Sequence, residues 1–104
     1  MPETNIPESD FYVVIARDGT DQEAPARRLA VRETHLALAR RMKAEGKIIH
    51  AGALLDDDRR MTGSLLVVAF ASRAELDAWL AADPYVTGGV WRQIEVRLFQ
   101  PAPL

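Results

Sequence analysis

The alternation of apolar and polar residues divides the chain into strands and helices, beginning with a strand and a long helix. Apolar and β-branched residues run from Phe11 to Ala16 and end at the turn pair Asp18-Gly19, which predicts a first strand. Residues 25–45 repeat apolar positions every three or four residues and stop at Gly46, which predicts a helix with a glycine at its C-terminal cap. The residues expected on its inward face are Leu29, His35, Leu36, Leu38, Ala39 and Met42.

Three further strands are predicted by β-branched and alternating segments. Residues 47–55 and 64–70 read as strands two and three, separated by the acidic turn 56–60. Residues 92–99 alternate cleanly between apolar and polar side chains, so they predict a fourth strand with one apolar face. The apolar positions of that strand are Ile94, Val96 and Leu98.

A second helix is predicted between the third and fourth strands. The capping-box pattern Ser72-Arg73-Ala74-Glu75 opens it, because such a hydroxyl and carboxylate can satisfy the free backbone N–H groups of a first turn. Leu76, Trp79 and Leu80 supply its apolar stripe. Pro84 ends it, since the residue before a proline is driven out of the helical region. A loop containing Gly88-Gly89 is expected to follow.

The order β-α-β-β-α-β predicts an α+β, ferredoxin-like sandwich. Right-handed crossovers give a four-stranded antiparallel sheet of order 4-1-3-2 with both helices on one face. The two central strands, 11–16 and 64–70, are apolar on both faces, so the uncovered face predicts a homodimer that packs sheet against sheet. We expect one domain over residues 10–100, a mobile N-terminal tail at 1–9 and a C-terminal tail at 101–104.

Composition limits the classes of function. The 104 residues contain no cysteine, which excludes disulfides and thiolate metal sites and fits a cytoplasmic location. No apolar run approaches the roughly 18–20 residues of a membrane span, so a membrane is not an expected partner. The net charge is −2 and the basic residues form no stripe, so nucleic acid is not an expected partner either. The basic residues of the first helix, interleaved with acids, predict a solvated face: Arg27, Arg28, Arg32, Arg40, Arg41 and Lys43.

His35 is the leading candidate for acid–base chemistry. The chain has only two histidines, and imidazole can both take and give a proton near neutral pH. His35 lies on the predicted inward face of the first helix, where the structural alternative is a hydrogen-bonded core histidine. His50 falls within the second strand and is interpreted as structural or exposed.

Asp83 is the second candidate, at the end of the second helix. An Asp-Pro pair is common turn chemistry, which is the structural alternative. A carboxylate at a helix C-terminus faces the negative end of the dipole, at a cost of about 0.3–1 kcal/mol, so a nearby N–H or cationic partner such as the His35 ring is favoured. In such a pair Asp83 fixes the imidazole tautomer and stabilises the imidazolium.

Three residues are candidates for substrate binding, each with a structural alternative. Arg32 could hold an anionic group through its planar guanidinium or form a salt bridge. Ser64, at the start of a strand, could donate to a ligand or serve as a turn hydroxyl, and Tyr85 could donate its phenol or simply pack. The consecutive acids 56–58 do not converge on one ion, so no metal is expected, and no phosphate loop or other cofactor motif is present.

Several short motifs together resemble the YciI-like (YCII-related) family over about residues 11–99. They are Arg32-x-x-His35-Leu36, Glu45-Gly46-Lys47-Ile48, Ala51-Gly52-Ala53-Leu54, Gly63-Ser64 and Ala82-Asp83-Pro84-Tyr85-x-x-Gly88-Gly89-Val90. The resemblance implies a dimeric ferredoxin-like α/β sandwich. It also implies an active site made by a His–Asp dyad, which maps onto His35 and Asp83.

The first functional hypothesis is a small cofactor-independent enzyme for a small organic, anionic or aromatic-derived metabolite. His35 and Asp83 would transfer a proton in an isomerase- or lyase-type step. The alternative is a non-catalytic dimeric module that binds a small ligand. A cofactor-free monooxygenase is a third possibility, against which the resemblance at Asp83-Pro84-Tyr85 argues.

Overall fold

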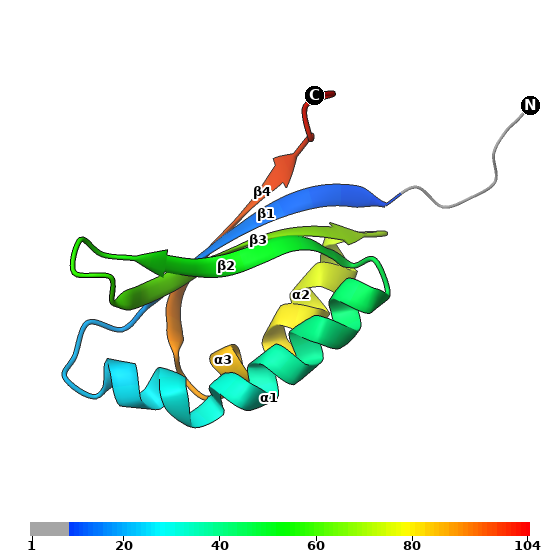
Figure 1. Ribbon diagram of the computed structural model, residues 1–104. Helices are drawn as coiled ribbons and strands as arrows, with labels where there is room; N and C mark the ends of the chain where they lie inside the picture. Colours follow the sequence, from blue (N-terminus) through cyan, green and yellow to red (C-terminus); the bar gives the residue numbers. More distant parts are fainter. Residues whose placement is uncertain (1–8) are drawn as a thin grey trace, which may run out of the picture.

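Four antiparallel strands form one sheet, and three helices lie against one of its faces (Figure 1). The computed structural model describes residues 9–104, so the predicted tail at 1–9 lies, apart from Ser9, outside the described residues. The sheet order β2-β3-β1-β4 is the predicted 4-1-3-2, which confirms the ferredoxin-like fold. The elements are β1 (Asp10–Asp18), α1 (Ala24–Ala44), β2 (Ile48–Leu55), β3 (Met61–Phe70), α2 (Arg73–Ala82), α3 (Pro84–Thr87) and β4 (Trp91–Phe99).

The core lies between the sheet and the helices because alternate side chains of the central strands point to that face. Tyr12, Val14 and Ala16 of β1 are buried there, as are Leu66, Val68 and Phe70 of β3. Leu76 and Leu80 of α2 complete the same cluster, as their spacing predicts.

The predicted helix ends are found where the sequence signals place them. Gly46 adopts a φ of 79°, a left-handed conformation that suits glycine, and its N–H donates to the Lys43 carbonyl at 3.0 Å. The next N–H, of Lys47, donates to the Met42 carbonyl at 2.9 Å, which completes a Schellman motif after α1. The Ser72 side chain accepts a hydrogen bond from the Glu75 N–H at 3.2 Å and caps α2.

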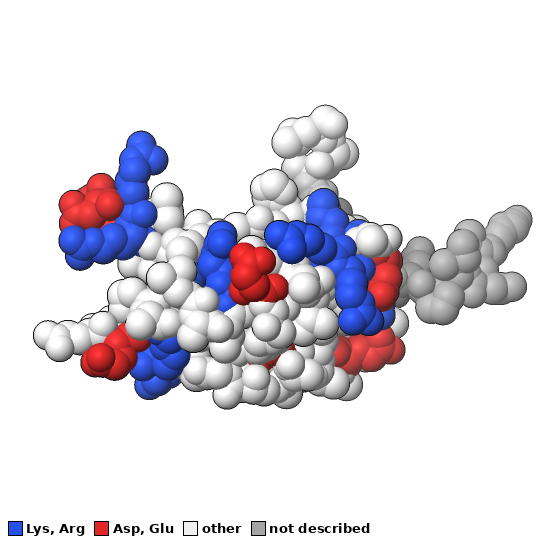
Figure 2. Space-filling view, turned by 60° about the horizontal axis from the view of Figure 1, so that its bottom comes forward, with Lys and Arg blue, Asp and Glu red and all other residues white. Residues whose placement is uncertain are grey.

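Two expectations for α1 are wrong. Leu29 is 63% exposed, whereas Arg28, expected in solvent, is only 4% exposed and packs under the sheet. The reason is that Asp18, at the end of β1, lies opposite this level of the helix and pairs with the guanidinium. On the surface of the helical side of the molecule, basic and acidic side chains are neighbours (Figure 2).

The loop expected after Pro84 contains the short helix α3. Asp83, which ends α2, also begins α3, and its Oδ1 accepts a hydrogen bond from the Tyr85 N–H at 2.8 Å. At the end of α2 alone, a carboxylate is unfavourable. The structure shows the carboxylate capping the start of α3, where aspartate is favoured.

The first carboxylate of the acidic turn after β2 forms hydrogen bonds within the turn itself. Asp56 Oδ1 accepts hydrogen bonds from the N–H groups of Asp58 and Arg60, both at 2.9 Å. Within residues 9–104, no group of three or more side chains is arranged to hold a metal ion. No helix of this described part is long and apolar enough to cross a bilayer.

Gly63 permits the close approach of β1 and β3 beside the site described below. A Cβ atom at this position would lie 2.3 Å from the Ala16 carbonyl oxygen, closer than any backbone contact allows. We therefore expect Gly63→Ala to lower the free energy of unfolding by about 1–3 kcal/mol, as overpacking does. Gly52→Ala is the control, since a Cβ atom there meets nothing within 4 Å. Urea unfolding followed by circular dichroism measures both, and equal stability of the two variants would contradict the expectation.

Candidate active site

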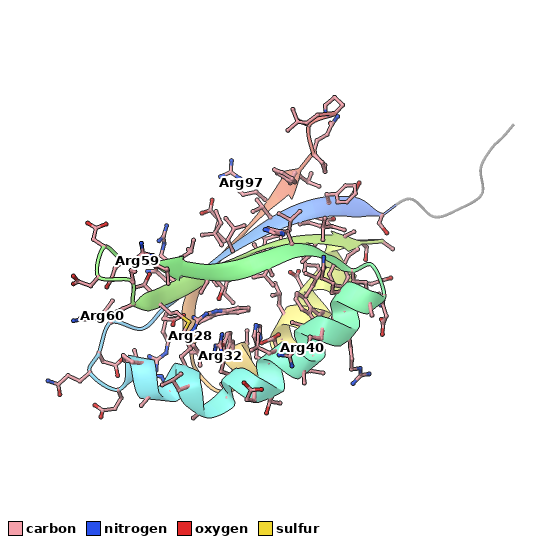
Figure 3. All side chains as sticks on the ribbon, in the orientation of Figure 1. Arg28, Arg32, Arg40, Arg59, Arg60 and Arg97 are labelled. Carbon is pink, nitrogen blue, oxygen red and sulfur yellow. The ribbon has the colours of Figure 1, made fainter. Side chains whose placement is uncertain are left out.

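A cavity of about 260 Å³ lies between α1 and the sheet. Its wall on the β2 side is made by the small residues Ala51, Gly52 and Ala53, which leave space opposite α1. Arg28 and Arg32 extend from α1 toward the sheet at this place (Figure 3). The polar side chains that line the cavity are Arg28, Arg32, His35, Ser64 and Tyr85. All three predicted substrate-binding residues therefore lie around one cavity with His35.

His35 and Asp83 form a buried hydrogen-bonded pair within one chain. His35 Nδ1 lies 2.8 Å from Asp83 Oδ1, and the residues are 7% and 2% exposed. The same Asp83 oxygen accepts the Tyr85 N–H, so the carboxylate is held by the cap of α3. The imidazole stacks on the Tyr85 ring, with centroids 3.8 Å apart and planes inclined by 12°, and meets the edge of Trp91 at 5.6 Å.

This arrangement assigns different tasks to the two imidazole nitrogens. An ionised Asp83 accepts a hydrogen bond, so Nδ1 carries the proton of the neutral ring. Nε2 is then left as an acceptor, and His35 lines the cavity. A ligand proton can move to Nε2 while Asp83 stabilises the imidazolium, which is the chemistry of a general base oriented by a carboxylate.

Tyr85 forms a neutral wall of the site. Burial raises the pKa of its phenol above the ordinary value of 10.0, against a lowering influence of the Arg28 and Arg32 charges. Tyr85 is 1% exposed, its ring stacks on His35, and the central carbon of the Arg28 guanidinium lies 4.8 Å from the ring centroid. The phenol therefore stays protonated at neutral pH, and the ring fixes the plane of the imidazole.

A second buried network, absent from the sequence-based candidates, surrounds Ser64. Arg28 Nη1 donates to both carboxylate oxygens of Asp18, at 2.8 and 3.0 Å, and Arg28 Nη2 donates to Ser64 Oγ at 3.0 Å. Trp91 Nε1 donates to the same Ser64 oxygen at 3.2 Å. Spacing alone could have indicated Arg28, because Arg28, Arg32 and His35 follow one another by four and three residues on a single helix face.

The two arginines of the cavity differ in their charge balance. Arg28 is neutralised by Asp18, with both side chains 5% exposed. Arg32 is half-buried at the cavity, and within residues 9–104 no hydrogen bond or ion pair of its guanidinium is found. The site thus presents one positive charge without an acidic partner to a ligand. His50 is exposed on β2 and takes no part in this cluster.

The fold and the site define a ferredoxin-like α+β domain whose cavity carries a buried His–Asp pair. The chain belongs to the YCII-related family, because the model of the YCII-related domain matches residues 11–100. Protein YciI of Escherichia coli O6:H1 is 35% identical over 96 residues, which cover 86% of this chain and 96% of that protein. An uncharacterized protein of Haemophilus influenzae is 34% identical over the same shares of both chains.

Solved structures carry the same fold. The dehydrochlorinase for 5-chloro-2-hydroxyhydroquinone (TftG) from Burkholderia phenoliruptrix AC1100, in complex with 2,5-dihydroxybenzoquinone, has a TM-score of 0.77 and 25% sequence identity. The match covers 88% of this chain and 95% of the dehydrochlorinase. A NIPSNAP family protein from Agrobacterium tumefaciens has a TM-score of 0.53 at 20% identity and covers 91% of this chain and 94% of that one, a likeness of fold alone.

Proposed function

We propose that this protein is a cofactor-independent enzyme that removes a proton from a small planar anion in a lyase- or isomerase-type step. The observation that carries the proposal is the buried His35–Asp83 hydrogen bond at the wall of a cavity. His35 Nε2 takes the proton, and Asp83 balances the charge that the ring gains. A positioned base of this kind contributes about 10²–10⁴-fold in rate.

The cavity favours a small anionic ligand. Its volume of about 260 Å³ suits a single ring with its substituents rather than a drug-sized molecule. Arg32 supplies a planar cation without an acidic partner among the described residues, which suits a carboxylate or a phenolate. Leu36 and Leu66 line the same cavity and offer apolar contacts to a ring.

The dehydrochlorinase relative supports an aromatic or quinol substrate. Removing HCl from a chlorinated hydroxyhydroquinone breaks two O–H bonds and the C–Cl bond and forms one C–H bond at the carbon that carried the chlorine. A base takes one hydroxyl proton, the other proton is delivered to that ring carbon, and the chlorine leaves as chloride with the electron pair of the C–Cl bond. We propose the same class of reaction for this chain, with His35 as the base. The electron pairs of the two broken O–H bonds form the two carbonyls of the quinone product. This oxidation is balanced by the reduction of C–Cl to C–H, so no external oxidant is required.

Chloride release tests this proposal directly. The wild-type protein is mixed anaerobically with 5-chloro-2-hydroxyhydroquinone, and free chloride is measured against the spontaneous reaction. We expect catalysed release that falls by about 10²–10⁴-fold in His35→Gln. His50→Gln, which changes the exposed histidine, is the control and should retain the wild-type rate. Binding of 2,5-dihydroxybenzoquinone without turnover would contradict the enzyme and support the alternative of a ligand-binding module.

We also propose that the protein works as a homodimer packed through its sheets. The face of the sheet opposite the helices carries paired apolar side chains from the two central strands, because the register places Val13 opposite Val67 and Ile15 opposite Leu65. The three helices found in residues 9–104 lie on the other face, so no helix of this described part covers these residues (Figure 1). An apolar face of this kind is typical of an interface.

Light scattering is expected to give twice the chain mass of 11.6 kDa. Val67→Asp places a charge at the centre of the apolar face and should halve the mass, because an unpaired carboxylate is costly to bury. Leu29→Asp makes the same change at an exposed position on α1 and should leave the mass unchanged. A wild-type monomer at micromolar concentration would contradict the dimer.

A further inference from the structure

The Ser64 hydroxyl has both of its acceptor positions occupied. A serine oxygen has two lone pairs and one hydrogen. Here the oxygen accepts from Arg28 Nη2 at 3.0 Å and from Trp91 Nε1 at 3.2 Å. Ser64 is 4% exposed and lines the cavity, and in the described part of the chain it donates to no other group. Its hydrogen is therefore left for a ligand in the cavity.

The two donors that hold Ser64 are themselves fixed. Arg28 is buried, pairs with Asp18 through both carboxylate oxygens and lies over the Tyr85 ring. Trp91 is 5% exposed, and its ring meets the edge of Tyr85 at 5.3 Å. Neither donor can turn away from Ser64 without losing its own buried contacts. A hydroxyl that accepts from a guanidinium is also polarised, which makes it a stronger donor.

We propose that Ser64 is an obligate hydrogen-bond donor for a phenolate or enolate oxygen of the ligand, and that Arg28 and Trp91 are its positioning residues. This inference rests on the proposed function only in placing the ligand in the same cavity. Arg32 supplies the positive charge that attracts the ligand oxyanion, and the Ser64 hydroxyl fixes the position of that oxygen by donating a hydrogen bond to it. Charge that develops on the ligand oxygen when His35 takes a proton is then met by a preorganised donor.

The same geometry makes the site selective against amines. A ligand N–H would need an acceptor, and both lone pairs of Ser64 Oγ are already used. To accept from an amine, the oxygen would have to release Arg28 or Trp91 and leave a buried donor unpaired. Sites built in this way reject the wrong hydrogen-bonding partner strongly.

Binding of 4-nitrophenol and 4-nitroaniline measures this selectivity, because the two probes differ only in the group that Ser64 would meet. At a pH where free 4-nitrophenol is mostly protonated, we expect the bound probe to show the visible phenolate band. Ser64→Ala should lose this band and bind the phenol about 10- to 100-fold more weakly, whereas Ser64→Thr, which keeps the hydroxyl, should retain both. Unchanged binding and band in Ser64→Ala would overturn the proposal, as would absence of phenolate binding to the wild type.

Trp91→Phe separates the positioning role from a purely structural one. It frees one lone pair of Ser64, so the preference for nitrophenol over nitroaniline should fall by about tenfold or more through a gain in amine binding. Weaker binding of both probes with unchanged selectivity would overturn the positioning role.

The probes are also measured in His35→Gln, which keeps the donors. If His35→Gln still binds the phenolate and the wild type releases no chloride, the proposed enzyme activity is contradicted, whereas the proposed donor role of Ser64 is upheld.

Discussion

Replacing Asp83 with asparagine is expected to lower kcat for the proposed reaction by about 10²–10⁴-fold and to leave the fold intact. Asp83 Oδ1 accepts hydrogen bonds from His35 Nδ1 and from the Tyr85 N–H, and an asparagine carbonyl oxygen can accept both of them. What asparagine removes is the negative charge. The imidazolium formed in the reaction then stands in a buried site without its counter-ion, which is costly.

The controls for this prediction separate charge from structure. Asp77→Asn removes a carboxylate from the exposed side of α2, where it pairs with Arg73, and should not change kcat. Asp83→Ala also removes the cap of α3 and should cost a further 0.5–2 kcal/mol or so of stability. Nitrogen-15 NMR of the His35 ring reports its tautomer, which Asp83→Asn should preserve. A full rate in Asp83→Asn would show that the carboxylate has only a structural task.

The sequence predicted the fold well because its strongest signals are local and periodic. The apolar residues on both faces of β1 and β3 identify the two strands that lie at the centre of the sheet. Gly46 ends α1 through its left-handed backbone conformation, and Ser72 begins α2 through its side-chain hydroxyl. Such signals act over a few residues and do not depend on distant partners. The family resemblance agreed with them, and the domain match over residues 11–100 confirms it.

The parts of the site that were missed depend on contacts between distant segments. Arg28 and Asp18 are separated by ten residues, and Arg28 and Ser64 by thirty-six. A charged residue on a helix is ordinarily solvated, so only the fold can show that a carboxylate lies opposite. The cap of α3 was missed for a related reason, because a four-residue helix has no hydrophobic period to reveal it. His35 was found because histidine is rare in this chain and lies on the apolar face.

Arg28→Met is the substitution expected to destabilise the protein most, by about 3–5 kcal/mol. The Arg28 and Asp18 side chains are each 5% exposed, so methionine leaves a carboxylate buried without a counter-ion. It also removes one donor from Ser64. Since a whole domain of this kind is stable by only about 5–15 kcal/mol, a loss of this size would unfold a large share of molecules in mild urea.

Two comparisons make the prediction for Arg28 specific. Arg27→Met breaks the neighbouring ion pair with Asp21, whose side chains are 23% and 49% exposed, and water replaces such contacts readily, so the unfolding midpoint should move little. Adding Asp18→Asn to Arg28→Met removes the stranded charge and should restore much of the lost stability, because the main cost is the unpaired carboxylate and not the missing bond. The double variant could instead be as unstable as Arg28→Met alone. The stability would then come from the packing of the guanidinium over Tyr85 and its hydrogen bond to Ser64, and the ion pair with Asp18 would contribute less than these two contacts.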